Sequence, residues 1–139
     1  MRADHAGDDV AGDLGEAQVD DFDLVAALLV ESDRRKAVFL NEAIRLLSLP
    51  AAVICDRIES IAPQRADVLS ARALASLDAL CGFAALHLAP GGVAIFPKGA
   101  NAPAERAEAA RNWRFASSET PSKTDAGAVI LCLKDIQHV

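Results

Sequence analysis

Apolar and polar positions alternate along the chain in blocks that predict strands followed by helices. Residues 24–30 (LVAALLV) form a short, nearly continuous apolar run that ends at Glu31. Such a run is typical of a parallel strand buried on both faces. After Ser32 or Asp33, either of which can cap a helix N-terminus, apolar residues recur at helical spacing as far as Pro50. The pattern therefore predicts a strand, a turn and a helix.

The same alternation continues through the rest of the chain. Strands separated by helices predict a parallel α/β sheet, and two adjacent strands at the end predict an antiparallel edge. A Pro90-Gly91-Gly92 breaker is expected to end the second helix. The further strands are predicted over residues 51–56, 66–71, 93–96, 113–116 and 128–133, and the further helices over 74–89 and 104–111.

The net charge of −6 at pH 7 conceals a strong asymmetry. Residues 1–33 carry ten acidic residues and one basic residue, whereas residues 34–139 carry 13 basic and 10 acidic ones. A polyanion such as RNA would be repelled by the first segment but not by the mildly basic remainder. Because residues 1–20 also lack apolar periodicity, we interpret them as a disordered acidic leader and residues 21–139 as the folded part.

The hydropathy pattern predicts a protein without a membrane partner. No apolar stretch reaches the roughly 18 residues that a bilayer-spanning helix requires. The first ten residues, MRADHAGDDV, are acidic where a signal peptide would be basic and then apolar. We therefore expect a cytoplasmic protein.

Covalent or metal chemistry has little support in the sequence. Cys55, Cys81 and Cys132 lie in apolar contexts without C-x-x-C spacing, so we interpret them as buried thiols. The three histidines are scattered along the chain and form no spacing typical of a metal site or a nucleophile–base pair. We predict no metal site and assign no catalytic side chain.

Polar residues follow two of the predicted strands, where open parallel sheets bind their ligands. Glu31 ends the first strand, and a carboxylate there can accept both hydroxyls of a ribose. It can equally be an acid stabilised by the start of the following helix. Ile58 and Glu59 follow the second strand, where an apolar side chain beside an acid can clamp an adenine and bind its amino group. A solvated turn is the alternative.

Two basic residues occupy equivalent positions after later strands. Arg72 directly follows the strand predicted over 66–71, and a cation there calls for a carboxylate or phosphate partner. That partner can be a ligand or an acid of the protein itself, such as Glu59 or Asp67. Lys98 follows the strand over 93–96, where it can approach a phosphate or lie in a surface turn.

Several blocks of sequence, in this order and spacing, resemble one known family over roughly residues 24 to 135. This is the bacterial small-subunit ribosomal RNA methyltransferase G family, also called glucose-inhibited division protein B. The resemblance implies a Rossmann-like, S-adenosylmethionine-dependent methyltransferase fold that makes 7-methylguanosine in 16S ribosomal RNA. It also implies the 30S subunit as partner and a monomeric state for the complete enzyme. The blocks are LVESDRRKAVFLNEAIRLLSLP, DRIES, ADVLSARALASLDALCGFAALHLAPGG, VAIFPKG and TDAGAVILCLKD.

The resemblance also implies roles for individual residues. Glu31 matches the acid that binds the cofactor ribose, and Ile58 and Glu59 match the pair beside the adenine. Arg72, in the block SARA, matches an arginine at the cofactor or the incoming nucleotide. Lys98, in FPKG, matches a lysine that would face RNA phosphate.

One motif of that family is missing from the chain. The family's first strand, which lies between the second and fourth, ends in a glycine-rich loop D-x-G-S/T-G-x-G-x-P-G. Here Asp13-Leu14-Gly15 is followed by Glu16-Ala17-Gln18. We therefore expect residues 21–139 to be the C-terminal part of an N-terminally truncated methyltransferase domain, with two open strand edges. A non-catalytic RNA-binding or interaction module is the alternative function, and a small-molecule methyltransferase is a third.

Overall fold

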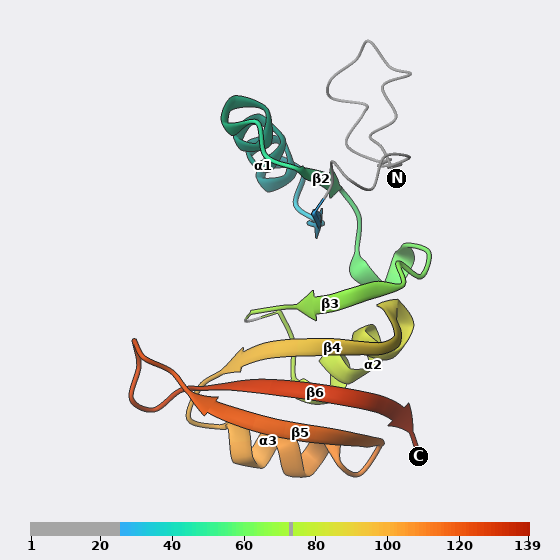
Figure 1. Ribbon diagram of the computed structural model, residues 1–139, viewed down its shortest axis with the longest axis vertical. Coiled ribbons are helices and arrows are strands. Elements are labelled where there is room, and N and C mark those ends of the chain that lie inside the picture. Colours follow the sequence, from blue (N-terminus) through green and yellow to red (C-terminus); the bar gives the residue numbers. More distant parts are fainter. Residues whose placement is uncertain (1–25, 73) are drawn as a thin grey trace. The chain divides into compact units, whose positions relative to one another are not determined.

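The computed structural model describes residues 26–72 and 74–139, and these form two compact units divided between Ile61 and Ala62 (Figure 1). Each unit contains its own sheet, with two strands in the first and four in the second. The leader predicted over residues 1–20 and the beginning of the first predicted strand lie outside the described residues.

The first unit is a strand–helix–strand element. Strands β1 (Ala27–Val30) and β2 (Ala51–Ile54) pair in parallel, with Val30 opposite Ile54. Helix α1 (Arg34–Leu47) connects them, and the short 3-10 helix η2 (Ile58–Ser60) follows β2. The side chains of this small core are Ala37 and Val53, with Leu29, Leu40, Ile44 and Cys55 packed against them.

The ends of α1 follow from local chemistry. Asp33 is the N-cap, and its carboxylate accepts hydrogen bonds from the backbone N–H groups of Arg35 (2.9 Å) and Lys36 (3.2 Å). This contact satisfies two donors that have no partner within the helix. At the other end, Ser48 adopts a left-handed conformation (φ 51°) two residues before Pro50. The sequence predicted either Ser32 or Asp33 as the N-cap, and the structure confirms Asp33.

The second unit is a mixed sheet with the strand order β3-β4-β6-β5. Strand β3 pairs in parallel with β4, whereas β6 is antiparallel to both β4 and β5. The predicted parallel α/β arrangement with an antiparallel edge is therefore confirmed. Its elements are β3 (Ala66–Ser70), α2 (Leu77–His87), β4 (Leu88–Lys98), α3 (Ala102–Ala109), β5 (Trp113–Pro121) and β6 (Val129–His138).

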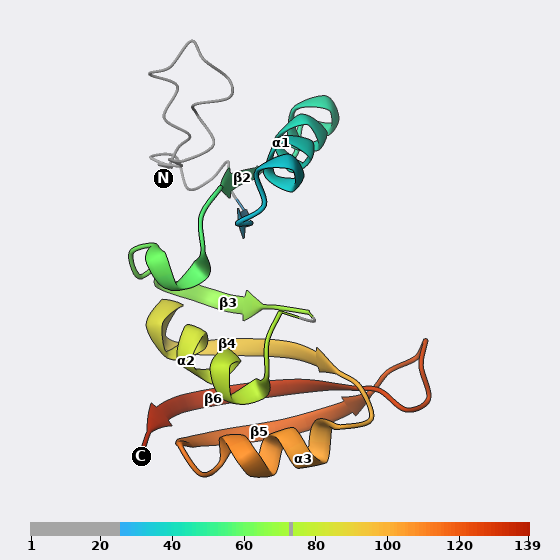
Figure 2. The same cartoon turned by 180° about the vertical axis from the view of Figure 1, so that it is seen from behind.

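Both helices of this unit cover the same face of its sheet, which Figure 2 shows toward the viewer. The buried core lies between the helices and this face and includes Leu77, Phe96 and Leu131. Val93 and Ile95, which alternate with the core positions of β4, are only half-buried, and Val68 beside Val93 is 57% exposed. No helix among the described residues of this unit covers that second apolar face.

The Pro90-Gly91-Gly92 segment is the clearest departure from the predicted elements. It lies within β4, which begins at Leu88 directly after α2, and does not form a loop before the strand. A Cβ on Gly92 would lie 2.9 Å from the carbonyl oxygens of Ala66 and Ala89, so glycine permits β3 to approach closely here. Helix α2 also begins at Leu77, later than predicted, because Ser76 caps it.

Four strands have an edge that no other described strand pairs with: β1 and β2 in the first sheet, and β3 and β5 in the second. Of these, β1 and β3 carry the edges that the family resemblance predicts to be open. Parallel sheets normally have both faces covered and their strands paired, so these edges and the apolar face beside Val68 favour association with other chains.

We predict that the purified chain self-associates through these edges. Val68→Lys places a charge on β3, a device by which natural edge strands resist pairing. It should shift the chain toward monomer in size-exclusion chromatography with light scattering, and change the free energy of unfolding by less than about 0.5 kcal/mol because Val68 is exposed. A monodisperse monomer with one cooperative thermal transition for the unaltered chain would contradict this prediction.

Candidate functional site

Glu31 lies directly after the carboxyl end of β1. Its backbone N–H donates to the carbonyl of Ile54 at 3.0 Å, which extends the parallel pairing by one residue. Its side chain is half-buried, and Oε2 accepts a hydrogen bond from the backbone N–H of Asp33 at 3.4 Å. The carboxylate therefore lies beside the N-terminus of α1, and its other oxygen, Oε1, takes no part in this hydrogen bond.

Ile58 and Glu59 lie in η2, four and five residues after the end of β2. Ile58 is half-buried, whereas Glu59 is exposed. A hydrogen bond from its own backbone N–H, and then the guanidinium of Arg57, hold the pKa of the Glu59 carboxyl below its ordinary value. The Nε atom of Arg57 lies 2.6 Å from Oε1 of Glu59. Glu59 is thus a negatively charged hydrogen-bond acceptor at neutral pH.

Glu31, Ile58 and Glu59 therefore follow the same ends of two adjacent parallel strands in one unit. This edge offers two carboxylates and one apolar side chain. Carboxylates at such an edge accept hydrogen bonds from hydroxyl and amino groups, and ligands of open α/β sheets bind there. The arrangement is chemically suited to a ribose and an adenine.

Arg72 belongs to the second unit. It follows β3 by two residues, and its side chain is exposed. The preceding residue, Ala71, is fixed by a hydrogen bond from its N–H to the carbonyl of Ile95 in β4 at 3.4 Å. Arg72 is therefore presented at the carboxyl end of the parallel pair β3–β4.

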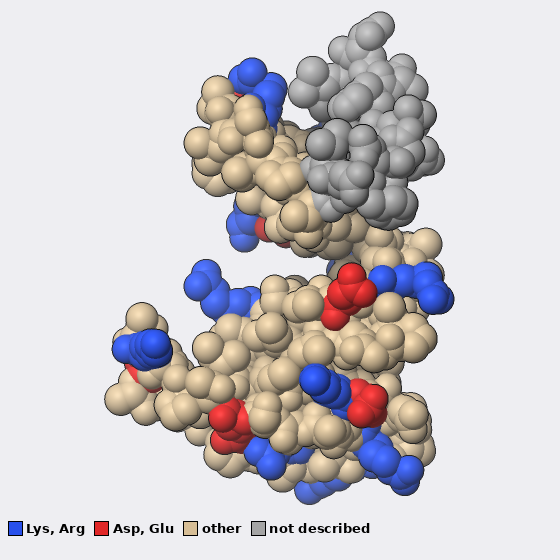
Figure 3. Space-filling model, in the orientation of Figure 1, with Lys and Arg blue, Asp and Glu red and all other residues tan. Residues whose placement is uncertain are grey.

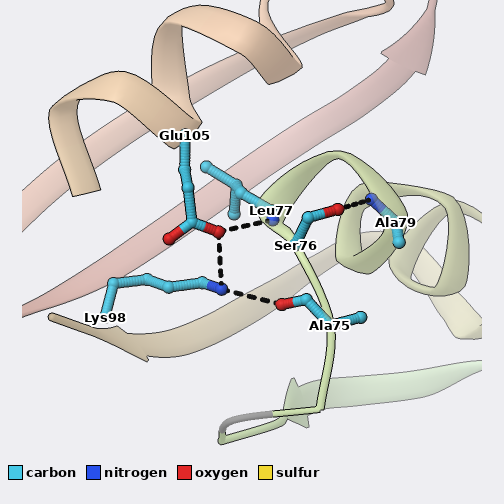
Figure 4. Close-up of polar contacts among 6 residues, drawn as sticks. All are labelled: Ala75, Ser76, Leu77, Ala79, Lys98 and Glu105. Carbon is cyan, nitrogen blue, oxygen red and sulfur yellow. Dashed lines mark hydrogen bonds and ion pairs between the residues drawn. The ribbon is translucent and has the colours of Figure 1, made fainter. Parts of the chain in front are cut away.

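Lys98 is the last residue of β4, and the structure gives it partners inside the protein. It is 9% exposed. Its Nζ lies 2.9 Å from the carbonyl oxygen of Ala75 and 3.0 Å from Oε1 of Glu105 (Figure 4). These contacts favour a structural role for Lys98, and its contact with RNA phosphate stays a prediction.

Glu105 is the residue of this region that the sequence pattern did not single out. It stands in the first turn of α3, and Oε1 also accepts a hydrogen bond from the backbone N–H of Leu77 at 3.1 Å. Glu105 could have been found from the sequence, because a buried lysine requires a carboxylate partner and few acidic residues lie near Lys98 in the chain. The block FPKGANAPAE places Glu105 seven residues after Lys98.

The surface gives no sign of a concentrated basic patch on the face drawn in Figure 3. On the second unit, positive and negative side chains are interspersed among uncharged ones. A groove of about 320 Å³ lies at the opposite end of β4 from Lys98, lined by residues that include Leu88, Pro90 and Asp135. It is therefore distant along the strand from the carboxyl-end residues. Within the described ranges, no helix is long and apolar enough to span a membrane, and no group of three or more potential ligand residues could hold a metal ion.

A family model described as rRNA small subunit methyltransferase G matches residues 22–129. Relatives named ribosomal RNA small subunit methyltransferase G are similar to most of the chain. One from Cereibacter sphaeroides is 55% identical over 112 residues, which cover 81% of this chain and 54% of the relative. One from a Ruegeria species is 50% identical over 111 residues, which cover 80% of this chain and 54% of the relative. The chain thus spans about half the length of the curated relatives it matches.

Solved structures support the fold. A SAM-dependent methyltransferase from Leishmania major aligns with a TM-score of 0.52 and 17% identity over 81% of this chain and 55% of that protein. A candidate methyltransferase from Thermoplasma acidophilum aligns with a TM-score of 0.51 and 16% identity over 77% and 56%. The predicted Rossmann-like α/β fold of methyltransferases is confirmed by this likeness.

The cysteines differ in exposure, and this difference predicts their reactivity. Cys81 is buried, whereas Cys55 and Cys132 are half-buried, and all three are free thiols. Burial, and then the nearby carboxylate of Asp78, raise the pKa of the Cys81 thiol to about 12. Because the thiolate is the reactive form, Cys81 is not suited to act as a nucleophile at neutral pH.

We predict that iodoacetamide at mildly alkaline pH alkylates Cys55 and Cys132 at least about tenfold faster than Cys81, because reaction requires an accessible thiolate. Mass spectrometry of tryptic peptides taken during the reaction measures the three rates. Modification of Cys81 first, in chain that remains folded, would be inconsistent with its buried position.

Proposed function

Because the chain belongs to the rRNA small subunit methyltransferase G family, we propose that it carries the adenosine-binding part of a 16S ribosomal RNA guanine-N7 methyltransferase that uses S-adenosylmethionine. The observation that carries this proposal is the match over residues 22–129 combined with the position of the candidate residues at carboxyl ends of parallel strands. The 30S subunit is the proposed substrate particle.

Glu31, Ile58 and Glu59 are the proposed contacts with the adenosine of the cofactor. Glu31 fits a ribose because its half-buried carboxylate is oriented by the N–H of Asp33. Glu59 fits the adenine amino group because its pKa is lowered and it remains an acceptor. Ile58, half-buried beside it, can pack on the adenine ring.

Arg72 is the proposed contact of the second unit with the cofactor or the incoming nucleotide. Its exposed guanidinium can pair with a carboxylate, such as that of the methionine moiety, or with an RNA phosphate. Both possibilities use the same position after β3, and both require the segment that carries Arg72 to hold its conformation.

The proposed reaction requires little acid–base chemistry from the protein. The bound cofactor supplies a methyl group on a positively charged sulfur, and N7 of guanine carries a lone pair and no proton. The residues of the site therefore need to orient the two reactants and exclude water, and a general base is not required. The absence of an assigned catalytic side chain is consistent with this chemistry.

The alternative is a non-catalytic RNA-binding or interaction module. One observation favours it: the sequence has no D-x-G-S/T-G-x-G segment, in which glycines let the backbone approach a cofactor closely. In this alternative the mildly basic residues 34–139 bind RNA with an affinity that falls as the salt concentration rises.

We predict weak binding of S-adenosylmethionine, in the high-micromolar range, when it is titrated into the chain by isothermal calorimetry. Glu31→Gln should weaken this binding about tenfold or more, because it removes a charge-assisted hydrogen bond. Glu42→Gln is the matched control, since Glu42 is an exposed acid on α1 whose partner is Arg45. It should leave the affinity unchanged.

Transfer of radiolabelled methyl groups to undermethylated 30S subunits separates the two functions. The proposed methyltransferase labels 16S RNA, and the module binds RNA without labelling it. No heat of binding at high-micromolar cofactor, together with salt-dependent RNA binding and no label, would overturn the proposed activity and favour the module.

A further inference from the structure

Arg72 lies between two backbone positions that hydrogen bonds fix. Ala71 donates its N–H to the carbonyl of Ile95 at 3.4 Å, and Ser76 caps α2 by accepting a hydrogen bond from the N–H of Ala79 at 3.3 Å. The second of these positions is the N-terminus of α2. The placement of residues 74–76 therefore depends on what fixes that N-terminus.

The Lys98–Glu105 pair contacts this N-terminus (Figure 4). The Nζ atom of Lys98 donates to the carbonyl oxygen of Ala75 at 2.9 Å, one residue before the cap. Oε1 of Glu105 accepts from the N–H of Leu77 at 3.1 Å, one residue after it. The lysine ammonium and the glutamate oxygen are themselves 3.0 Å apart. Two charged groups thus hold the backbone on either side of Ser76.

Both side chains of this pair are largely removed from water. The side chain of Lys98 is 8% exposed and that of Glu105 is 24% exposed. A lysine that has lost most of its water needs both a counter-charge and hydrogen-bond acceptors. Here the acceptors are Glu105 on α3 and the carbonyl of Ala75 just before α2, so the starts of both helices are tied to the end of β4. An RNA phosphate could reach Nζ only after these contacts had opened.

We propose that Lys98 and Glu105 are positioning residues, which hold residues 74–76 at the N-terminus of α2 and thereby restrict where Arg72 lies at the carboxyl edge of β3 and β4. The proposal concerns this part of the backbone, and its consequence for ligand binding rests on the proposed function of Arg72. Lys98 then acts through the backbone of Ala75 and makes no contact with RNA.

Limited trypsin digestion tests this placement without any ligand. Trypsin cuts after Arg72, which follows β3, and after Lys134 in β6, a strand paired on both sides, so one chain reports both local opening and opening of the sheet. Cleavage that follows opening tracks the population of the open form. Lys98→Met removes the ammonium but keeps an unbranched apolar chain, and Glu105→Gln removes the charge but keeps an oxygen for the N–H of Leu77.

Both variants should raise the cleavage rate after Arg72 by about tenfold or more relative to the rate after Lys134, because a buried group is left without its charged partner. The matched controls are Arg106→Met and Glu119→Gln. They break the ion pair between Arg106 on α3 and Glu119 on β5, whose groups are 43% and 38% exposed. Neither control should change the ratio of the two rates.

Two outcomes would overturn the proposal. Equal acceleration after Arg72 and Lys134 would mean that the pair stabilises the whole unit and does not position residues 74–76. No acceleration after Arg72 would mean that other contacts hold them.

A second measurement links the pair to Arg72. In calorimetry, Lys98→Met and Arg72→Ala should each lower the affinity for S-adenosylmethionine. The double variant should bind no less tightly than the single variant that has the lower affinity. Losses that add in full would contradict positioning through Arg72. An unaltered chain that binds no cofactor would overturn the proposed function, and the digestion would still decide the role of the pair.

Discussion

Parallel pairing of strands is the constraint on which the candidate site depends. In the first unit the register places Val30 opposite Ile54, and in the second it places Ser70 opposite Ile95. Since paired parallel strands end at the same edge, the residues that follow them collect there. Helices α1 and α2 both begin at such edges, so their N-terminal N–H groups and positive dipole ends lie beside the collected residues.

Much of the fold was predictable because short apolar runs and helix caps are local signals. Asp33 is an N-cap by chemistry that needs no tertiary context, and the strands after it have apolar side chains at successive positions. Pro90-Gly91-Gly92 was misread because its role is not local. Glycine is required at position 92 because the carbonyl of Ala66 on the neighbouring strand lies so close, and Ala66 is far from Gly92 in the sequence.

The site was predictable only in part, for the same reason. Glu31, Ile58, Glu59 and Arg72 could be selected because each follows a recognisable strand. Lys98 also follows a strand, but its partners Ala75 and Glu105 come from segments 23 residues before it and 7 residues after it. Whether a cation faces a ligand or an internal carboxylate is decided by such contacts. The sequence could therefore place Lys98 at the end of a strand, but its internal partners are known only from the structure.

Hydrogen–deuterium exchange with and without S-adenosylmethionine tests most directly whether the carboxyl edges form the binding site. At the highest soluble cofactor concentration, slower exchange is expected in residues 31–33, 56–60 and 71–76, which follow β1, β2 and β3. The segment around Pro90 and Asp135, at the other end of β4, should not change. Protection confined to that groove, or no protection at any of the three segments, would contradict the assignment of these strand ends to the cofactor.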